Sequence, residues 1–204
     1  HAKLPDYHDP PKLRSCYRSE LLHRLKLCGK EKDVSKARSI HADIITKGLL
    51  KDNVYIGSAL IHMYAKCRSL TEAQEVFDKL LVRDVVTWTA MIGGFSDHGF
   101  TEEALKHYDE MHFEGIYPNS VTVICVLKAC SSKKELDKGK QIHKEIVNNG
   151  LLAKDSVLGT ALIGMYAKCG ELGQAQEVFE ELPIRNVASW SALISGYQQH
   201  GQAD

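Results

Sequence analysis

Residues 59–67 are ALIHMYAKC and residues 161–169 are ALIGMYAKC, so one segment returns almost unchanged 102 positions further along the chain. The similarity extends beyond these segments, because 24 of 49 positions are identical between 54–102 and 156–204. Self-similarity at a fixed offset is typical of repeat architectures, in which similar units stack along the chain. The sequence therefore predicts stacked repeats.

A unit of 102 residues is too long for one supersecondary element, and helix-breaking residues divide it further. Apolar residues recur at helical spacing on both sides of Arg68 within 54–84, and on both sides of Gly99 within 85–119. Strand-like alternation is absent from the pattern. Each unit is expected to be two antiparallel helices of about 12 residues. Such a short hairpin cannot bury both faces alone, so neighbouring hairpins must stack into an all-α solenoid.

Two Ser/Glu pairs have the spacing of a capping box, in which a serine and a glutamate three positions later bond each other's backbone N–H groups. Ser69 with Glu72 and Ser132 with Glu135 predict the start of a second helix in two of the hairpins.

The composition is that of an ordinary folded protein, with 44% apolar and 25% charged residues. A formal net charge of zero argues against a uniformly basic nucleic-acid binder. Residues 1–50 hold 11 Lys/Arg against 6 Asp/Glu, whereas 51–204 hold 15 against 20. No window approaches the roughly 18 continuous apolar residues of a membrane span, so no membrane partner is expected.

The chain begins with His1 rather than Met, as expected of a fragment, so the absence of a targeting peptide says nothing about the compartment. The six cysteines include no CxxC pair, and we expect reduced thiols packed within helices. Reduced thiols are consistent with an intracellular or organelle-matrix protein.

Several long motifs resemble pentatricopeptide repeats (PPRs), in particular the plant-organelle class in which P-, L- and S-type units alternate. DVVTWTAMIGGF at 84–95 and EALKHYDEM at 103–111 are similar to the P-type unit. SVTVICVLKAC at 120–130 resembles the L-type, and GTALIGMYAKCGELGQAQEVFEELPIRN at 159–186 resembles the S-type.

This resemblance implies a right-handed α-solenoid of stacked antiparallel helical hairpins. The implied order is an N-terminal extension at 1–17, an L-type unit at 18–53, an S-type unit at 54–84, a P-type unit at 85–119, an L-type unit at 120–155, an S-type unit at 156–186 and a partial P-type unit at 187–204.

The resemblance also implies sequence-specific binding of single-stranded organellar RNA, one nucleotide per unit, running 5′ to 3′ from the N- to the C-terminus. In such repeats the fifth residue, on the inner face of the first helix, and the last residue, in the turn before the next unit, select the base. A small hydroxyl at the fifth position leaves room for a purine and can donate or accept. At the last position Asp offers only acceptors, which suits guanine, whereas Asn offers both kinds of group and is compatible with adenine.

On this frame the base-recognition residues are Ser58 with Asp84 for guanine, Thr89 with Asn119 and Thr160 with Asn186 for adenine, and Ser191 without its partner. Both L-type units depart from the pattern, with Leu22/Asn53 and Ile124/Asp155, because an apolar fifth residue cannot hydrogen-bond a base edge. The expected RNA is therefore N-G-A-N-A-purine.

Two further sets of residues follow from the resemblance. The second residue of a unit clamps the base by apolar contact, which assigns Tyr55, Val86 and Val157, with the smaller Ala188 in the last unit. The thirteenth residue is a lysine near phosphate, which assigns Lys30, Lys66 and Lys168, although the P-type unit has Asp97 there.

Three other patterns have competing interpretations. His143-Lys144-Glu145 matches the H-x-E of zinc deaminases, but the P-C-x-x-C ligands are missing, so helix packing is favoured. Cys67 and Cys169 lie three units apart, too far for one metal or disulfide, and are taken as small residues at tight helix ends. Trp88 and Trp190 could stack on bases, but their place on an apolar stripe favours core packing.

The leading interpretation is an RNA-binding module from an organellar RNA editing or processing factor, in a mitochondrion or chloroplast, working with other editing or processing proteins. The alternative is a protein–protein interaction scaffold of the helical-repeat type. An enzyme is disfavoured because no nucleophile–base pair, phosphate loop or metal constellation occurs in the sequence, and no cofactor is expected. Exposed helix faces near 187–204 are expected to cause self-association.

Overall fold

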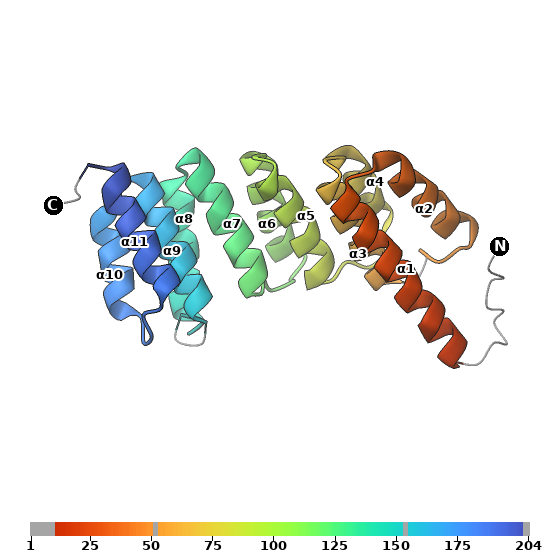
Figure 1. Cartoon of the computed structure of the whole chain (residues 1–204). Coiled ribbons are helices and arrows are strands. Elements are labelled where there is room, and N and C mark those ends of the chain that lie inside the picture. Colours follow the sequence, from red (N-terminus) through yellow and green to blue (C-terminus); the bar gives the residue numbers. More distant parts are fainter. Residues whose placement is uncertain (1–10, 51–52, 153–154, 202–204) are drawn as a thin grey trace. The chain divides into compact units, whose positions relative to one another are not determined.

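The computed structural model describes residues 11–50, 53–152 and 155–201, with side chains from Tyr17 onward. Within these residues all regular structure is helical, which confirms the predicted fold class (Figure 1). The described helices are α1 (Pro11–Glu31), α2 (Val34–Thr46), α3 (Val54–Lys66), α4 (Leu70–Lys79), α5 (Val85–Asp97), α6 (Thr101–Phe113), α7 (Ser120–Lys133), α8 (Leu136–Asn148), α9 (Ser156–Cys169), α10 (Leu172–Glu181) and α11 (Val187–Gln199).

The N-terminal extension expected at 1–17 lies partly outside the described residues. Its residues 11–17 belong to α1, which makes this helix 21 residues long, whereas the other described helices have 10 to 14. Parts of the predicted units at 51–52, 153–154 and 202–204 also lie outside the described residues.

Tight turns with left-handed backbone connect the two helices of each hairpin, and the two copies of the repeat use the same positions. Lys32 and Lys134 have φ of 56° and 58°, and Arg68 has φ of 62° where its counterpart Gly170 has 88°. Glycine adopts this region without strain, whereas other residues are disfavoured there. The break predicted at Arg68 is therefore a real turn.

The helices form two compact units, residues 1–94 and 95–204. Within the first unit α1 packs against α3, and within the second α7 packs against α9 and α9 against α11, so the first helices of neighbouring hairpins lie side by side. Glycine allows this close approach. A Cβ at Gly94 of α5 would lie 2.9 Å from the Ala65 Cβ, and one at Gly196 would lie 2.6 Å from the Ala167 Cβ.

Aromatic rings fill the space between the second helix of one hairpin and the first helix of the next, from α4 to α5 and from α10 to α11. Trp88 is 1% exposed and meets Phe77 edge-on, with ring centroids 4.7 Å apart, which confirms core packing for this tryptophan. Trp190 meets Phe179 in the same way at 4.5 Å, but half of its surface is exposed.

Neither predicted capping box forms. Ser69 is the N-cap of α4 but makes no side-chain capping bond, and Glu72 instead accepts hydrogen bonds from Arg38 of α2. Ser132 lies inside α7 and donates to the Lys128 carbonyl, while Glu135 is itself the N-cap of α8. Glu72 binds the charged Arg38 side chain, which is a stronger partner than a backbone N–H. Ser132 binds a carbonyl of its own helix, which is a nearer partner than the start of α8.

No helix in the described part of the chain is both long and apolar enough to cross a bilayer.

Candidate nucleic-acid interface

The proposed last residues of the repeats are the N-caps of the helices that follow them. Asp84 Oδ1 accepts hydrogen bonds from the Thr87 backbone N–H and the Thr87 hydroxyl, both at 2.8 Å. Asn119 Oδ1 accepts from the Thr122 N–H at 2.9 Å, and a bond from the Asn119 N–H to the Thr122 hydroxyl completes a capping box. The sequence analysis missed this capping role, although Asp or Asn before each first helix is its usual signature.

Capping uses one side-chain atom and leaves the other available. Asn186 caps α11 in the same way, because its Oδ1 accepts from the Ser189 N–H at 2.9 Å. Because a backbone N–H needs an acceptor, the amide oxygen of Asn119 and Asn186 faces the helix and the NH₂ group faces away. The second oxygen of Asp84 and these NH₂ groups have no hydrogen-bond partner among the described residues. Asp84 thus presents an acceptor, and the two asparagines present donors.

The proposed fifth residues share another local geometry. The hydroxyls of Ser58, Thr89 and Thr160 donate to the carbonyls four residues earlier, at 2.7, 2.6 and 3.1 Å. In this arrangement the single hydroxyl proton is used within the helix, which leaves the oxygen as an acceptor, and donation to a base requires the hydroxyl to rotate. Ser58 is 6% exposed, Thr89 and Thr160 are half-buried, and Ser191 is exposed.

Apolar side chains stand exposed at the second position of successive first helices. Tyr55, Val86 and Val157 are 63%, 50% and 56% exposed. Val121 of α7 is 57% exposed at the same position, although it was not among the predicted clamping residues. Ala188 is also exposed.

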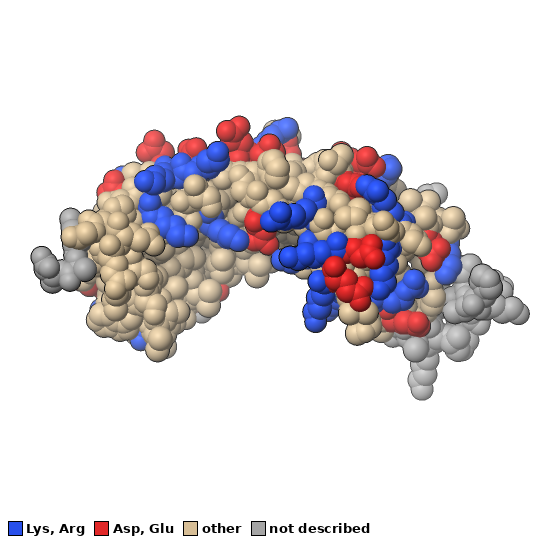
Figure 2. Space-filling model, turned by 45° about the horizontal axis from the view of Figure 1, so that its top comes forward, with Lys and Arg blue, Asp and Glu red and all other residues tan. Residues whose placement is uncertain are grey.

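The proposed phosphate-binding lysines, Lys30, Lys66 and Lys168, are exposed near the ends of first helices. Asp97, the residue at this position in the unit predicted to be P-type, pairs with Lys128 at 2.7 Å. Figure 2 shows Lys and Arg interleaved with Asp and Glu rather than gathered in one basic band. Any attraction for phosphate therefore depends on individual side chains more than on bulk charge.

The two units predicted to be L-type keep the capping atom but lack the hydroxyl. Asn53 and Asp155 cap α3 and α9 by accepting from Ile56 N–H at 3.3 Å and Val157 N–H at 2.9 Å. Their fifth residues, Leu22 and Ile124, are half-buried.

The structure supports a packing role for the H-x-E segment. His143 Nδ1 lies 2.9 Å from the Tyr166 hydroxyl, and Glu145 Oε2 accepts from the Tyr108 hydroxyl at 2.9 Å. The two side chains thus have separate partners. No group of three or more His, Cys, Asp or Glu side chains suited to a metal ion occurs within the described residues.

Five cysteines with described side chains are free thiols in helical surroundings: Cys28, Cys67, Cys125, Cys130 and Cys169. Cys67 and Cys169 occupy corresponding helix ends, as the C-cap of α3 and the last residue of α9. Burial raises the pKa of the Cys67 thiol to about 11 and that of Cys130 to about 12, so both stay protonated at neutral pH.

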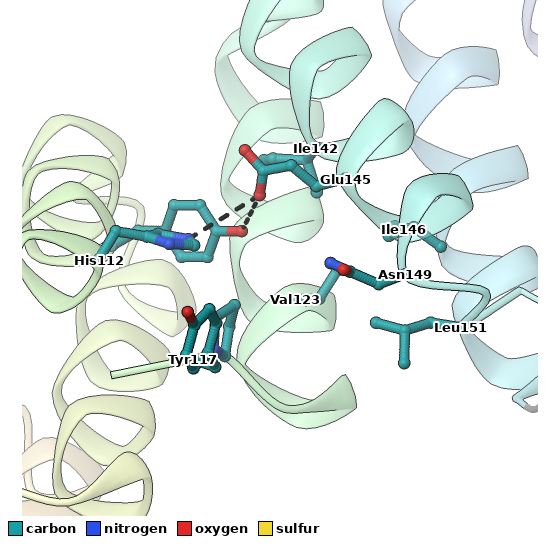
Figure 3. A pocket seen from close by; sticks show the side chains of 10 residues that line it. His112, Tyr117, Val123, Ile142, Glu145, Ile146, Asn149 and Leu151 are labelled. Atoms are coloured by element: carbon teal, nitrogen blue, oxygen red, sulfur yellow. Dashed lines mark hydrogen bonds and ion pairs between the residues drawn. The ribbon is translucent and has the colours of Figure 1, made fainter. Parts of the chain in front are cut away.

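A pocket of about 500 Å³ opens beside the turn between α6 and α7 (Figure 3). Val123, Ile142 and Ile146 form its apolar floor, and the side chains of Tyr117 and Asn149 line its rim. Tyr117 is 84% exposed. The pocket belongs mainly to the second helices α6 and α8, and it contains none of the proposed base-recognition residues.

Profiles of a known repeat family match most of this chain. A profile of the PPR repeat family matches residues 83–132, and the PPR repeat profile matches 58–85, 121–151, 160–187 and 188–204.

Two similar proteins come from Arabidopsis thaliana. Pentatricopeptide repeat-containing protein At4g18520, chloroplastic, is 37% identical over 177 residues, covering 87% of this chain and 28% of that protein. Putative pentatricopeptide repeat-containing protein At3g13770, mitochondrial, is 39% identical over 177 residues, again covering 87% and 28%. The chain thus spans little more than a quarter of the length of these relatives.

The crystal structure of the maize pentatricopeptide repeat protein PPR10 has a TM-score of 0.68 at 18% identity, covering 89% of this chain and 27% of that one. PPR10 in complex with an 18-nt psaJ RNA element has a TM-score of 0.62 at 17% identity, covering 90% and 32%. At this identity the likeness establishes a shared fold.

Proposed function

Because the chain belongs to the pentatricopeptide repeat family and is homologous to organellar members of it, we propose that it binds single-stranded RNA sequence-specifically, one nucleotide per repeat. One observation carries this proposal: each complete non-L unit ends in an Asp or Asn whose second polar atom is left over after capping. An exposed apolar residue stands two positions after each of these caps. The fold shared with PPR10, whose structure includes an RNA element, supports the same function.

The leftover atoms match different bases. The second oxygen of Asp84 can accept from the N1–H and N2–H₂ groups of guanine, which adenine lacks. The NH₂ groups of Asn119 and Asn186 can donate to N1 of adenine. The hydroxyl oxygens of the half-buried Thr89 and Thr160 can receive an N–H from a purine, and Ser58, which is 6% exposed, can do so once its side chain is uncovered. The proposed register remains N-G-A-N-A-purine, with no base assigned to the L-type units.

Exchanging one capping atom tests this assignment. In Asp84→Asn the amide oxygen can still cap α5, but the leftover acceptor becomes a donor, so the preference at the second nucleotide should change from G to A. A good bidentate base contact distinguishes bases by about 1–3 kcal/mol, so we expect at least about a fivefold reversal in filter binding. Asp155→Asn is the matched control, because it makes the same change at the cap of α9 and should leave all preferences unchanged. RNAs whose G and A positions can be exchanged without loss of affinity would refute the base assignment.

The setting in the cell is part of the proposal. We place the chain in the class with alternating P-, L- and S-type units, in a mitochondrial or chloroplast factor for RNA editing or processing that acts with other proteins of that machinery. Similarity to relatives named as chloroplastic and mitochondrial supports the compartment.

A protein–protein scaffold is the second candidate, and the pocket beside α6 and α8 favours it. Its apolar floor and exposed Tyr117 are features of a peptide-binding site, because aromatic residues are enriched where proteins meet. Tyr117→Ser should abolish peptide capture that survives nuclease treatment if this function is correct, and it should leave RNA binding intact. Capture unaffected by this substitution would exclude the pocket as the binding site.

A further inference from the structure

A contact between α1 and α3 places a cation on one of the exposed second-position residues. The Arg18 guanidinium carbon lies 4.5 Å from the centroid of the Tyr55 ring. Arg18 belongs to α1, which packs beside α3, so the guanidinium approaches Tyr55 from the side of the preceding hairpin. Tyr55 remains 63% exposed, which leaves most of the ring accessible to a ligand.

Tyr55 is the single aromatic residue among the exposed second-position residues of α3, α5, α7, α9 and α11. An aromatic ring can stack on any base, whereas valine offers a smaller apolar contact. A guanidinium held parallel or close to such a ring keeps its N–H groups free at the edges, where they can reach a phosphate.

Among the described residues no carboxylate pairs with Arg18. Its guanidinium has no ion pair or hydrogen bond to another described residue, and the ring of Tyr55 is its one recorded contact. Its side chain is exposed. By contrast, other cations that cross between hairpins are paired, as Arg38 is with Glu72 at 2.6 Å and Lys138 with Asp109 at 2.6 Å. The Arg18 guanidinium is a planar cation whose N–H groups are unused, so it can donate hydrogen bonds to the oxygens of a phosphodiester.

The repeat that contains Arg18 has no hydroxyl to meet a base, because its fifth residue is the apolar, half-buried Leu22. Under the proposed polarity, this repeat faces the nucleotide on the 5′ side of the guanine at Asp84. Arg18 lies against Tyr55 on that side, where a base would otherwise stack.

We propose that Arg18 and Tyr55 form the 5′ end of the RNA path: the Tyr55 ring stacks on the guanine, and the Arg18 guanidinium binds the phosphate on its 5′ side. The inference rests on the proposed RNA function. It adds that the first position of N-G-A-N-A-purine is held through the phosphate that joins it to the guanine and not through its base.

Two oligonucleotides that differ in one group test this inference. Wild-type protein should bind 5′-phosphorylated G-A-N-A-purine about fivefold more tightly than the 5′-hydroxyl form in 0.1 M salt, the effect of one single-strand phosphate contact. Arg18→Ala should remove that difference and lower the slope of log K against log salt by about 0.7. Arg18→Lys keeps the charge and should retain most of the slope. A phosphate moved to the 3′ end should give no fivefold gain.

Arg24→Ala is the matched control, because Arg24 is another exposed arginine of α1 and should leave the 5′-phosphate effect intact. Circular dichroism verifies that the variants keep their helical content. The inference is overturned if Arg18→Ala still prefers the 5′-phosphate form, or if Arg24→Ala loses the preference equally. Wild-type protein that distinguishes G from A but ignores the 5′-phosphate would overturn this inference alone. Absence of any RNA binding would overturn the proposed function and this inference with it.

Discussion

His41 and His143 have the same surroundings in the two copies of the repeat. Their Nδ1 atoms lie 3.0 Å from the Tyr64 hydroxyl and 2.9 Å from the Tyr166 hydroxyl. Both Nε2 atoms are buried and lack a hydrogen-bond partner in the described part of the chain. Burial lowers the pKa of both imidazoles below the ordinary 6.5, and Lys79 adds to this at His41. The folded protein therefore favours neutral rings, because burial disfavours the charged imidazolium.

We expect this pair to make the protein less stable in acid. Below pH 6.5 the unfolded chain binds more protons than the folded chain, so the free energy of unfolding rises with pH in that window. The stability that the two neutral histidines contribute is fully present above pH 6.5. It is lost as the pH falls towards the lowered pKa values of these histidines in the folded protein. Urea titrations from about pH 5 to pH 8 measure it. The double variant His41→Gln/His143→Gln should have a flatter profile, whereas His23→Gln, at an exposed position, should keep the wild-type slope. An unchanged slope in the double variant would contradict the assignment.

At the scale of helices, the spacing between first helices depends on glycine. A Cβ at Gly94 would lie 2.9 Å from the Cβ of Ala65, which is fixed to the α3 backbone and cannot rotate away. Gly94→Ala should therefore destabilise the protein by about 1–3 kcal/mol, the usual effect of overpacking. Gly164→Ala is the control: its Cβ would meet nothing within 4 Å, so helix propensity alone should stabilise α9 by about 0.5–1 kcal/mol. Equal effects of the two substitutions in urea unfolding would show that helix contact is not the cause.

The sequence predicted the helices well because their signals are local and occur twice. The 102-residue offset and the turns at Arg68 and Gly99 were enough to infer stacked hairpins. The chemistry of the caps was harder to predict. Ser69 satisfies the capping-box pattern, but its partner Glu72 bonds Arg38, 34 positions earlier, and spacing within one helix cannot reveal such a contact. The contact between Arg18 and Tyr55 was missed for the same reason, since it joins two hairpins.

At the scale of the whole molecule, equal numbers of acidic and basic residues limit what electrostatics can contribute to RNA binding. A neutral protein gains little from long-range attraction, so the proposed RNA recognition must come from short contacts made at each repeat. Exposed apolar side chains at the second positions and leftover polar atoms at the caps are contacts of this kind. Affinity should consequently grow with the number of repeats engaged, while base preference stays a property of each one.

The exposed apolar face of α11 is expected to cause self-association. Trp190 and Ile194 are each 50% exposed, whereas their counterparts Trp88 and Ile92 are 1% and 0% exposed. Two such faces can bury each other, and each Å² of apolar surface removed from water contributes about 25 cal/mol. Sedimentation velocity over a range of concentrations should show dimers or larger species, and Ile194→Lys should shift them to monomer because burying a lysine is costly. Phe113→Lys is the control, since Phe113 is 94% exposed away from α11 and its replacement should leave the association unchanged. A wild-type monomer at every concentration would show that this face stays solvated in isolation, despite its apolar composition.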